Sequence, residues 1–408
     1  MSEIWYHAYM TETKKIRCSE CGNNPTNHLF SLIGNTASIL LYPLDTILVG
    51  NFFGKKIGQF IVYATKPYLA ILKSLHLISW NTDSSKALTK RAQVIWEEAQ
   101  KRNIPMKQLV ILGRPVEFYT AKIKGGKTLF FESIPQTKCG YIESYGWMDD
   151  KNILKKKLAQ KNIATPRGGS AWNYAQALHI FKQIGGPVII KPRIGSRGRH
   201  TTTFIYTEED FKKAYQSAKK LCFFVIIEEH LIGSVYRGTC INNTLVGVLE
   251  GMPPRITGTG VHTISELLKQ KNLSLPDNHI RSVTIDTKME EFLTRLGYTP
   301  LSILPARLTI DVSEKIGLSY GGNSRELFKE THPLLIQELE KAAICVNAGV
   351  IGFDFIIDDP RTNPENKKWG IIECNSLPFI NLHHDPHEGE PINIAELVWN
   401  EVEARYVK

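Results

Sequence analysis

Residues 187–204, PVIIKPRIGSRGRHTTTF, hold the pattern that decides the fold. An apolar run ends on Lys191, and a basic stretch with two glycines follows before the chain alternates again. A lysine at the end of a buried strand is desolvated and therefore needs an anionic partner. Gly195 and Gly198 let the backbone approach a ligand closely. The stretch predicts a strand, a loop and a second strand that together bind phosphate.

The side chains of this loop add donors for the same ligand. Ser196, Arg197 and Arg199 stand beside the two glycines, and each offers hydrogen-bond donors. The loop is not a P-loop, because it lacks the GxxxxGKS or GxxxxGKT spacing. Taken alone, the stretch also fits an ordinary surface hairpin.

Helices and strands alternate on both sides of this hairpin. The patterns predict helices over 149–163, 177–184, 208–220 and 334–348, and strands over 223–229, 351–357 and 369–375. Nearer the N-terminus they predict a helix over 84–102 capped by Asp83 or Ser84, a strand over 108–113, and a hairpin that turns at Gly125-Gly126. This arrangement is typical of an α/β or α+β enzyme built mostly from antiparallel hairpins.

Two of the buried strands carry oxygen ligands. Glu373 and Asn375 are two residues apart, so on a strand they face the same side, and Asp354 on the neighbouring strand completes the set. Carboxylates with an amide carbonyl suit a hard ion such as Mg²⁺, which usually shares its shell with phosphates. The alternative is a buried carboxylate paired with arginine or lysine.

A third candidate element is the strand FFVIIEE, which ends on Glu228 and Glu229. Backbone groups and a carboxylate at this position suit an adenine and its sugar. By itself the signal is weak, because acidic residues at strand ends are commonly solvated.

The bulk composition narrows the class of protein. With 408 residues, 42% hydrophobic and 22% charged, the chain is long enough for more than one domain and is not disordered. The net charge of +10 suits an anionic partner, yet no lysine or arginine block of the nucleic-acid type occurs. The first twelve residues lack the pattern of a signal peptide, which favours the cytoplasm.

The N-terminal region is apolar. Residues 28–53 are long enough to span a membrane, but Asn35, Pro43, Asp45 and Asn51 interrupt them. We expect a buried piece of two elements with a break at Tyr42-Pro43. Contact of residues 28–82 with a membrane surface is the less favoured alternative.

Seven cysteines are too few and too irregular for a disulfide framework. Cys18 and Cys21 form a CxxC, but no second cysteine pair follows at zinc-ribbon spacing. A turn with two reduced thiols is therefore the expectation, and a structural metal is the alternative.

Taken in order, these segments resemble the ATP-grasp superfamily, and most closely the ATP-grasp domain of cyanophycin synthetases. Bifunctional glutathione synthetases are the next most similar. The resemblance covers about residues 146–398 and rests on MDDKNILKKKLAQKNIATPRG, PVIIKPRIGSRGRHT, IIEEHLIGSVYRG, RITGTGVHTISELLKQKN, LSYGGNSRELFKETHP and ECNSLPFINLHHDPHEGEPINIAELV. It implies an ATP-grasp fold, in which two α+β subdomains clasp ATP, preceded here by a small N-terminal domain.

The resemblance also implies a role for each matching residue. Lys191, with Lys151 or Lys155, would contact the nucleotide phosphates, and the loop Gly195, Ser196, Arg197 and Gly198 would close over them. Glu228 and the backbone of Leu231 would hold adenine, with Glu229 nearby. Asp354, Glu373 and Asn375 would hold Mg²⁺, as two ions, with Mn²⁺ as an alternative. Arg237, Arg255 and His383 would lie at the reacting groups.

The sequence departs from these relatives where substrates lie. Val235 stands where an acidic residue usually grips the ribose, and Phe379 and Asn381 replace a small residue and an arginine. The second, Mur-ligase-like module of cyanophycin synthetases is not in this sequence. The substrate of that family is therefore not carried over.

The expected function is an ATP- and Mg²⁺-dependent carboxylate–amine ligase that works through an acyl phosphate. Its partners would be a small acid, amino acid or peptide and an amine, with no nucleic acid, and self-association stays open. A glutathione synthetase-like ligase and a non-catalytic nucleotide-binding regulator at a membrane surface are the alternatives. We expect three regions: an apolar one over 1–82, an α/β one over 83–145, and the ATP-grasp domain over 146–408.

Overall fold

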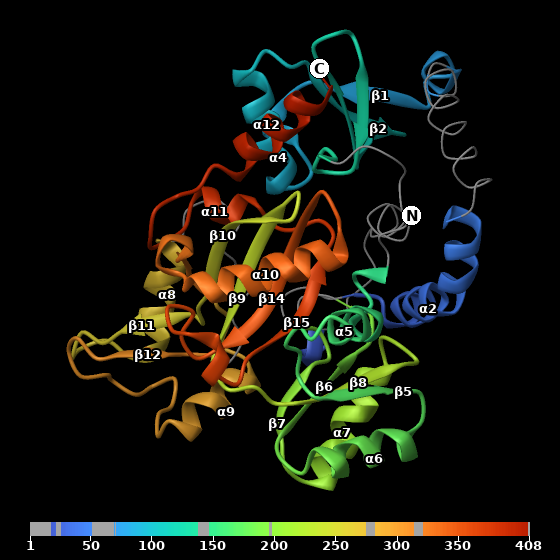
Figure 1. The fold of residues 1–408 in the computed structure, drawn as a ribbon. Coiled ribbons are helices and arrows are strands. Elements are labelled where there is room, and N and C mark those ends of the chain that lie inside the picture. The colour runs from blue at the N-terminus through green and yellow to red at the C-terminus, as the bar shows by residue number, and fades with distance from the viewer. Residues whose placement is uncertain are drawn as a thin grey trace.

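The computed structural model describes residues 18–21, 26–50, 69, 71–137, 147–195, 198–274, 282–313 and 321–406. Within these ranges the strands form four sheets, and neighbouring strands in each sheet run antiparallel. Helices pack against the sheets (Figure 1). The structure thus confirms the predicted α+β class built from antiparallel hairpins.

The first sheet belongs to an N-terminal domain. Its order is β1-β2-β3-β4, with bounds Ile78–Asn81, Met106–Ile111, Arg114–Lys122 and Thr128–Phe131. Strands β3 and β4 form the hairpin predicted around Gly125-Gly126. Strand β1 lies before the expected boundary at residue 82, yet it pairs with β2. The domain therefore begins before residue 83.

The last helix of the chain completes this N-terminal domain. Helix α12 (Ile394–Tyr406) packs on α4 (Lys90–Lys101), and the buried Trp399 donates its Nε1–H to the Ile95 carbonyl at 2.9 Å. Arg102 pairs with Glu403 at 2.7 Å. The two helices lie side by side in Figure 1. Residues near both ends of the chain thus share one core, which the expected boundaries had separated.

Helix α4 begins later than the sequence predicts. Asp83 caps a short 3-10 turn, Ser84–Lys86, and Thr89 caps the α-helix by accepting from the Ala92 N–H. Asp83, the cap predicted for the α-helix, therefore caps the 3-10 turn instead. The buried face of α4 includes Ala92, Ile95 and Ala99, which are fully buried.

The predicted break at Tyr42-Pro43 is wrong. Residues His28–Gly50 form one continuous helix, α2, that runs through Pro43. A proline removes one hydrogen-bond donor from a helix and need not end it. The helix is also not buried, since Leu29, Phe30, Ile33 and Leu40 are each more than half exposed. In the described part of the chain, no helix combines the length and apolar character that a membrane crossing needs.

A second four-stranded sheet forms a separate lobe, which we call the first lobe. Its order is β5-β8-β6-β7, with bounds Gly168–Ala171, Val225–Glu229, Val188–Pro192 and Thr202–Ile205. Helices α6 (Tyr174–Ile184) and α7 (Glu208–Lys219) pack on one face through an apolar core. Because side chains alternate along strands, Lys191 and Glu228 point to the opposite face. We call this the inner face.

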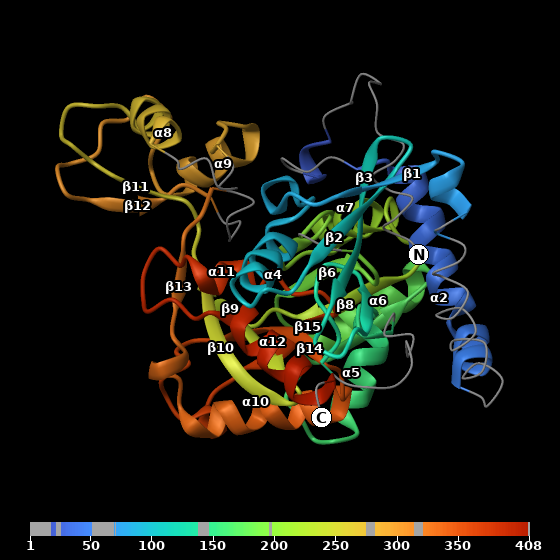
Figure 2. The ribbon, with the colours of Figure 1, turned by 90° about the horizontal axis from the view of Figure 1, so that it is seen from above.

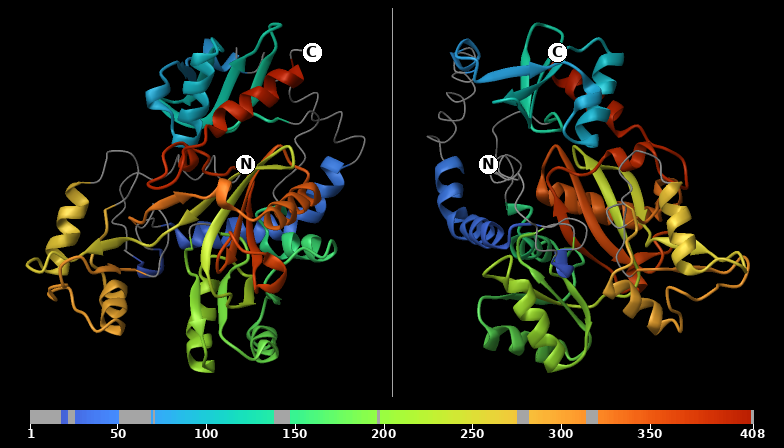
Figure 3. Two further views of the ribbon diagram at one scale, coloured as in Figure 1. Left: turned by 60° about the vertical axis from the view of Figure 1, so that its left-hand side comes forward. Right: turned by 180° about the vertical axis from the view of Figure 1, so that it is seen from behind.

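The largest sheet lies at the centre of the molecule. Its order is β13-β10-β9-β14-β15, with bounds Ser324–Glu326, Thr244–Gly251, Ser234–Ile241, Val350–Ile357 and Gly370–Asn375. Helix α10 (Pro333–Val346) packs on β9 and β10, and α5 (Lys151–Ala159) packs on β15. Figure 3 shows this central sheet between the first lobe and the N-terminal domain.

An arm leaves the central sheet between β10 and β13. It comprises β11 (Arg255–Thr257), α8 (Ile264–Leu273), α9 (Thr287–Arg295) and β12 (Thr309–Asp311). Thr263 and Glu266 form a capping box that starts α8. The arm has its own small core and projects to one side in Figure 2.

Candidate nucleotide and metal site

A buried charge cluster lies on the inner face of the first lobe. The Glu228 carboxylate has no exposed surface and lies 2.9 Å from Lys191 Nζ and 3.0 Å from Lys155 Nζ. Burial alone would raise the pKa of Glu228, but the two ammonium groups hold it below its ordinary value. Burial lowers the pKa of Lys155. Two cations share one carboxylate, so the cluster keeps a net positive charge that suits an anionic ligand.

Helix α5 positions two of the predicted lysines. Asp150 caps its N-terminus by accepting from the N–H groups of Asn152 and Ile153, and Arg193 holds the same carboxylate at 2.8 Å. Lys151 and Lys155 are one turn apart and therefore share a face of the helix. That face is directed at the cluster and at the loop after Lys191.

Lys151 connects the first lobe to the central sheet. Its Nζ donates to the Gly195 carbonyl at 2.8 Å and lies 3.4 Å from Glu373 Oε1. Gly195 has φ of 154°, a value that residues with a side chain rarely adopt. The predicted loop residues Ser196 and Arg197 lie outside the described residues, whereas Gly198 is described and exposed.

The second acidic residue of the strand faces away from the cluster. Glu229 follows Glu228 on β8 and therefore points to the other side of the sheet. Its carboxylate accepts from the Arg167 N–H at 2.8 Å and pairs with Lys368 at 2.8 Å. Burial would raise the pKa of Glu229, but these partners lower it. Its oxygens are thus already engaged, and the nearby Leu231 is buried.

The three predicted metal ligands lie on adjacent strands of the central sheet. Asp354 on β14 pairs in register with Glu373 on β15, and Asn375 Nδ2 lies 3.4 Å from Asp354 Oδ2. Asp354 also forms a bidentate ion pair with Arg237 of β9, at 2.8 and 2.9 Å. The alternative drawn from the sequence, a carboxylate paired with a cation, therefore describes Asp354, although its side chain is only partly buried.

Sequence reasoning missed a third carboxylate at this position. Asp149 accepts from the Ser376 hydroxyl at 3.2 Å, which places it beside the end of β15. Burial, and then the negative charge of Glu373, raise the pKa of Asp149 to about 6. The pair Asp149-Asp150 suggested only a helix cap, and Asp150 alone fills that function.

His383 is buried rather than exposed to a ligand. Its ring has no accessible surface, its Nδ1 lies 2.5 Å from Glu326 Oε2, and its Nε2 lies 2.7 Å from Thr239 Oγ1. A side chain on Gly247 would place its Cβ 2.7 Å from the same ring. Both ring nitrogens are therefore used in binding α11 (Asn381–His384) to strands β9 and β13.

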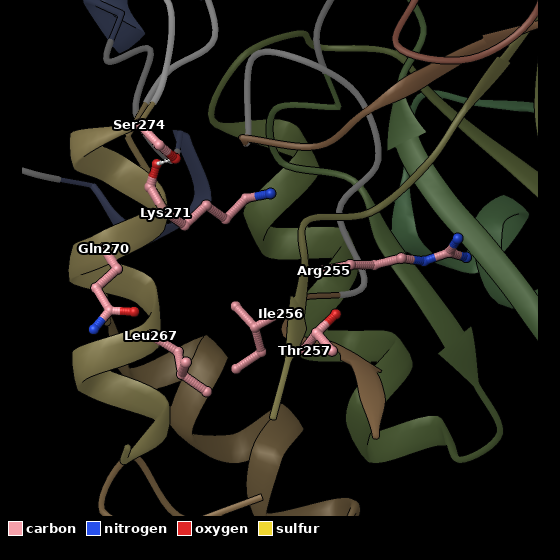
Figure 4. Close-up of a pocket in the computed structure, with 7 residues that line it drawn as sticks. All are labelled: Arg255, Ile256, Thr257, Leu267, Gln270, Lys271 and Ser274. Atoms are coloured by element: carbon pink, nitrogen blue, oxygen red, sulfur yellow. Dashed lines mark hydrogen bonds between the residues drawn. The ribbon is translucent and has the colours of Figure 1, made fainter. Parts of the chain in front are cut away.

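Arg255 lies on the arm, apart from the other predicted residues. Its Nε donates to Asp311 Oδ1 at 2.7 Å across the β11–β12 ladder, and its side chain is half exposed. Figure 4 shows the adjoining depression of about 340 Å³, with Lys271 and Gln270 on α8 opposite Ile256 and Thr257. The Arg255 side chain extends away from α8 in this view.

Arg91 connects the N-terminal domain to the segment that follows β15. Arg91 of α4 is buried, donates to the Leu377 carbonyl at 2.7 Å, and lies over the Phe379 ring at 5.3 Å from its centroid. Arg237 lies 5.8 Å from the centroid of the same ring. Phe379 is one of the residues at which the sequence departs from its relatives. Arg91 looked like an ordinary helix residue in the sequence.

The fold pairs two α+β lobes whose charged side chains meet at Lys151, and comparison with known proteins shows what the chain is similar to. The family model of the carbamoyl-phosphate synthase L chain, ATP binding domain, matches residues 150–233. The glutathione biosynthesis bifunctional protein of Listeria welshimeri is 27% identical over 88% of this chain and 46% of its own length. Cyanophycin synthetase of Trichormus variabilis is 27% identical over 76% of this chain and 35% of its own length.

A solved structure supports the fold. The bifunctional glutathione synthetase from Pasteurella multocida superposes with a TM-score of 0.55 at 23% identity, over 77% of this chain and 43% of that one. These comparisons support the resemblance to the ATP-grasp superfamily. The chain spans less than half the length of these relatives.

Proposed function

We propose that the protein is an ATP- and Mg²⁺-dependent carboxylate–amine ligase. The observation that supports this most is the contact made by Lys151. This one side chain reaches both the Gly195 carbonyl of the loop after Lys191 and the Glu373 carboxylate of the central sheet. The cationic cluster and the oxygen-rich set are therefore neighbours, as a nucleotide with its metal requires.

The first lobe would bind ATP. Lys191 and Lys151 would contact its phosphates, and Gly195 and Gly198 would allow the loop backbone to approach them. Glu228 would orient Lys191 and Lys155, and the buried position of Leu231 fits an apolar wall for adenine. Val235 and the engaged Glu229 leave the ribose without the usual carboxylate.

The oxygen-rich set would hold Mg²⁺. Asp354, Glu373 and Asn375 offer the hard oxygen ligands that this ion prefers, and Asp149 lies beside them. The negative carboxylates of Asp354 and Glu373, which lie opposite each other on adjacent strands, repel each other. A divalent cation between them would offset this repulsion. When bound, the ion would neutralise charge that develops during phosphoryl transfer.

The cationic side chains would then serve the reaction. ATP would phosphorylate the substrate carboxylate, an amine would attack the acyl phosphate, and ADP and phosphate would leave. Arg237, which pairs with Asp354, would stabilise the transferring phosphoryl group, and Arg255 would contact substrate from the arm. His383 would act as a positioning residue, because it binds α11 to the central sheet.

The substrate would be a small acid, amino acid or peptide. The relatives named for glutathione and cyanophycin biosynthesis both suit this class, but Phe379 under Arg91 and Arg237 alters the wall beside the reacting groups. A glutathione synthetase-like ligase is the nearest variant of the proposal. The cytoplasmic location, the absence of a nucleic-acid partner and self-association stay predictions from the sequence.

A second candidate function is a nucleotide-binding regulator without turnover. The observation that favours it is the engagement of Glu229 by Arg167 and Lys368 next to Val235, which leaves the ribose position without an acidic residue. A regulator would bind ATP but release no ADP with any substrate.

Release of ADP separates the two functions. The full chain would be incubated with MgATP and a panel of amino acids and dipeptides, with and without amines. The ligase predicts ADP that depends on both substrates and disappears in Glu373→Ala, whose far-ultraviolet circular dichroism stays native. ATP binding without ADP across the panel would support the regulator. Undiminished ADP release by Glu373→Ala would contradict the metal assignment.

A further inference from the structure

Four further side chains with ligand atoms converge outside the nucleotide site. Cys18 precedes the short 3-10 turn Ser19–Cys21, and Cys21 ends it. His28 begins α2, and His200 lies between β6 and β7. Their ligand atoms all lie within 4.8 Å of one another. In the sequence only the CxxC stands out as a possible metal-binding motif, because His200 is separated from Cys18 by 182 positions.

The distances within this set match those around a tetrahedral ion. His28 Nε2 and His200 Nε2 are 3.3 Å apart, and the nitrogen–sulfur separations are 3.3, 3.4 and 3.6 Å. Zinc with bonds of about 2.3 Å to sulfur and about 2.05 Å to nitrogen places two nitrogens about 3.3 Å apart and a nitrogen and a sulfur about 3.6 Å apart. The four atoms therefore surround a space of the right size for this ion.

The second nitrogen of His200 has the partner that a metal-binding histidine needs. Its Nδ1 lies 2.9 Å from the carbonyl oxygen of Ser217 on α7. A carbonyl only accepts, so the proton lies on Nδ1 and the Nε2 lone pair faces the two sulfurs and His28. His200 is fully buried, and its φ of 51° is uncommon for a residue other than glycine.

The four ligands join α2 and the turn before it to the first lobe, and two hydrogen bonds of α2 support this attachment. Helix α2 touches the first lobe through Asn35, which donates to the Leu221 carbonyl, and Thr36, which accepts from the Phe223 N–H. The His200 N–H donates to the Glu20 carbonyl at 3.2 Å. Much of the apolar surface of α2 stays exposed, so hydrophobic packing contributes little to its attachment.

We propose that Cys18, Cys21, His28 and His200 form a structural zinc site that fastens the N-terminal segment and α2 to the first lobe. Two thiolates and two imidazoles are a known structural donor set for zinc, and four protein ligands leave no open position for catalysis. The expected turn with two reduced thiols is present, and the proposed site takes up the alternative of a structural metal. The second pair of ligands, which a zinc ribbon would supply as cysteines, would here be His28 and His200.

The metal content of the full chain tests this proposal. The protein would be produced with zinc in the medium and purified under reducing conditions with excess Mg²⁺, which competes for the oxygen-rich set. Elemental analysis should find about one zinc ion per chain in the wild type and in Glu373→Ala. Retention in Glu373→Ala separates this site from the nucleotide site, so either proposal can fail alone.

Variants assign the ligands. Cys21→Ser and His200→Ala should lose the zinc, whereas Cys345→Ser should keep it, because that half-buried thiol lies on α10 and donates to the Lys157 carbonyl. A full equivalent of zinc in Cys21→Ser would overturn the proposal.

Reconstitution of the wild type covers the case in which a ligand variant fails to fold. After removal of zinc by a chelator, Co²⁺ should restore one equivalent with the charge-transfer absorption of cobalt bound to thiolate and the intense visible bands of a tetrahedral site. A wild-type chain that takes up neither zinc nor cobalt, or that joins Cys18 to Cys21 as a disulfide under reducing conditions, would contradict a zinc site.

Discussion

Replacing Lys191 or Lys155 by methionine offers a matched pair of perturbations. Both ammonium groups contact the same buried carboxylate, at 2.9 and 3.0 Å, and their side chains are 7% and 12% exposed. Methionine keeps an unbranched side chain and removes only the charge. Each variant leaves Glu228 with one cation in place of two.

The expected loss of unfolding free energy depends on how Glu228 responds when one of its two cations is removed. Breaking a buried ion pair costs about 3–5 kcal/mol when the remaining charge has no partner. Glu228 limits this loss by taking up a proton, which from its ordinary pKa of 4.5 costs about 3.4 kcal/mol at pH 7. Since one lysine remains, we expect each variant to lose about 1–3 kcal/mol of unfolding free energy.

The loss should depend on pH in a defined direction. The pKa of Glu228 is lowered in the folded wild type, so its contribution to stability is present above pH 4.5 and declines as the pH falls through the folded pKa. The gap between wild type and variant should therefore be about the same at pH 7 and pH 5 and narrow below pH 4.5. Urea denaturation at several pH values measures it.

Nucleotide binding distinguishes the two lysines. Lys191→Met should also weaken ATP binding at least tenfold, because that ammonium lies at the start of the glycine loop. Lys155→Met should affect stability to a similar degree with a smaller effect on binding. Two variants as stable as the wild type at pH 7, or a gap that widens towards pH 5, would refute the ion cluster as described.

Three further predictions concern other parts of the fold. Trp399→Ala should cost about 3–5 kcal/mol in urea denaturation, because it removes a fully buried indole that joins α12 to α4, and a native-like midpoint would contradict the shared core. Gly247→Ala should destabilise by about 1–3 kcal/mol and raise the KM for substrate, because its Cβ displaces His383, and unchanged kinetics would argue against a positioning residue. Arg91→Met should raise the KM for the carboxylate substrate more than the KM for ATP, because Arg91 holds Leu377 and Phe379, and an equal effect on both in steady-state kinetics would place it elsewhere.

Local patterns predicted the parts of the site that lie on strands. Side chains alternate on a strand, so Glu373 had to share a face with Asn375. The structure places them so. Glu229 follows from the same rule, which directs it away from Glu228 and towards Arg167.

Contacts between distant segments could not be predicted in this way. The cluster of Cys18 with His200 and the packing of Trp399 on Ile95 join segments that no local period relates. Pro43 was misleading for a different reason, because a proline only disfavours a helix and the flanking residues decided the outcome. The pairing of Arg237 with Asp354 was predicted only as an alternative. It depends on which residue of the neighbouring strand lies opposite Asp354.

Calorimetric binding of a non-hydrolysable ATP analogue tests the central claim most directly. The account places phosphate binding on Lys191 of the first lobe and metal binding on Glu373 and Asn375 of the central sheet. Lys191→Met should weaken binding both with and without Mg²⁺, whereas Asn375→Ala should remove only the part of the affinity that Mg²⁺ adds. Wild-type affinity and full Mg²⁺ dependence in Asn375→Ala would contradict a nucleotide site shared between the two lobes.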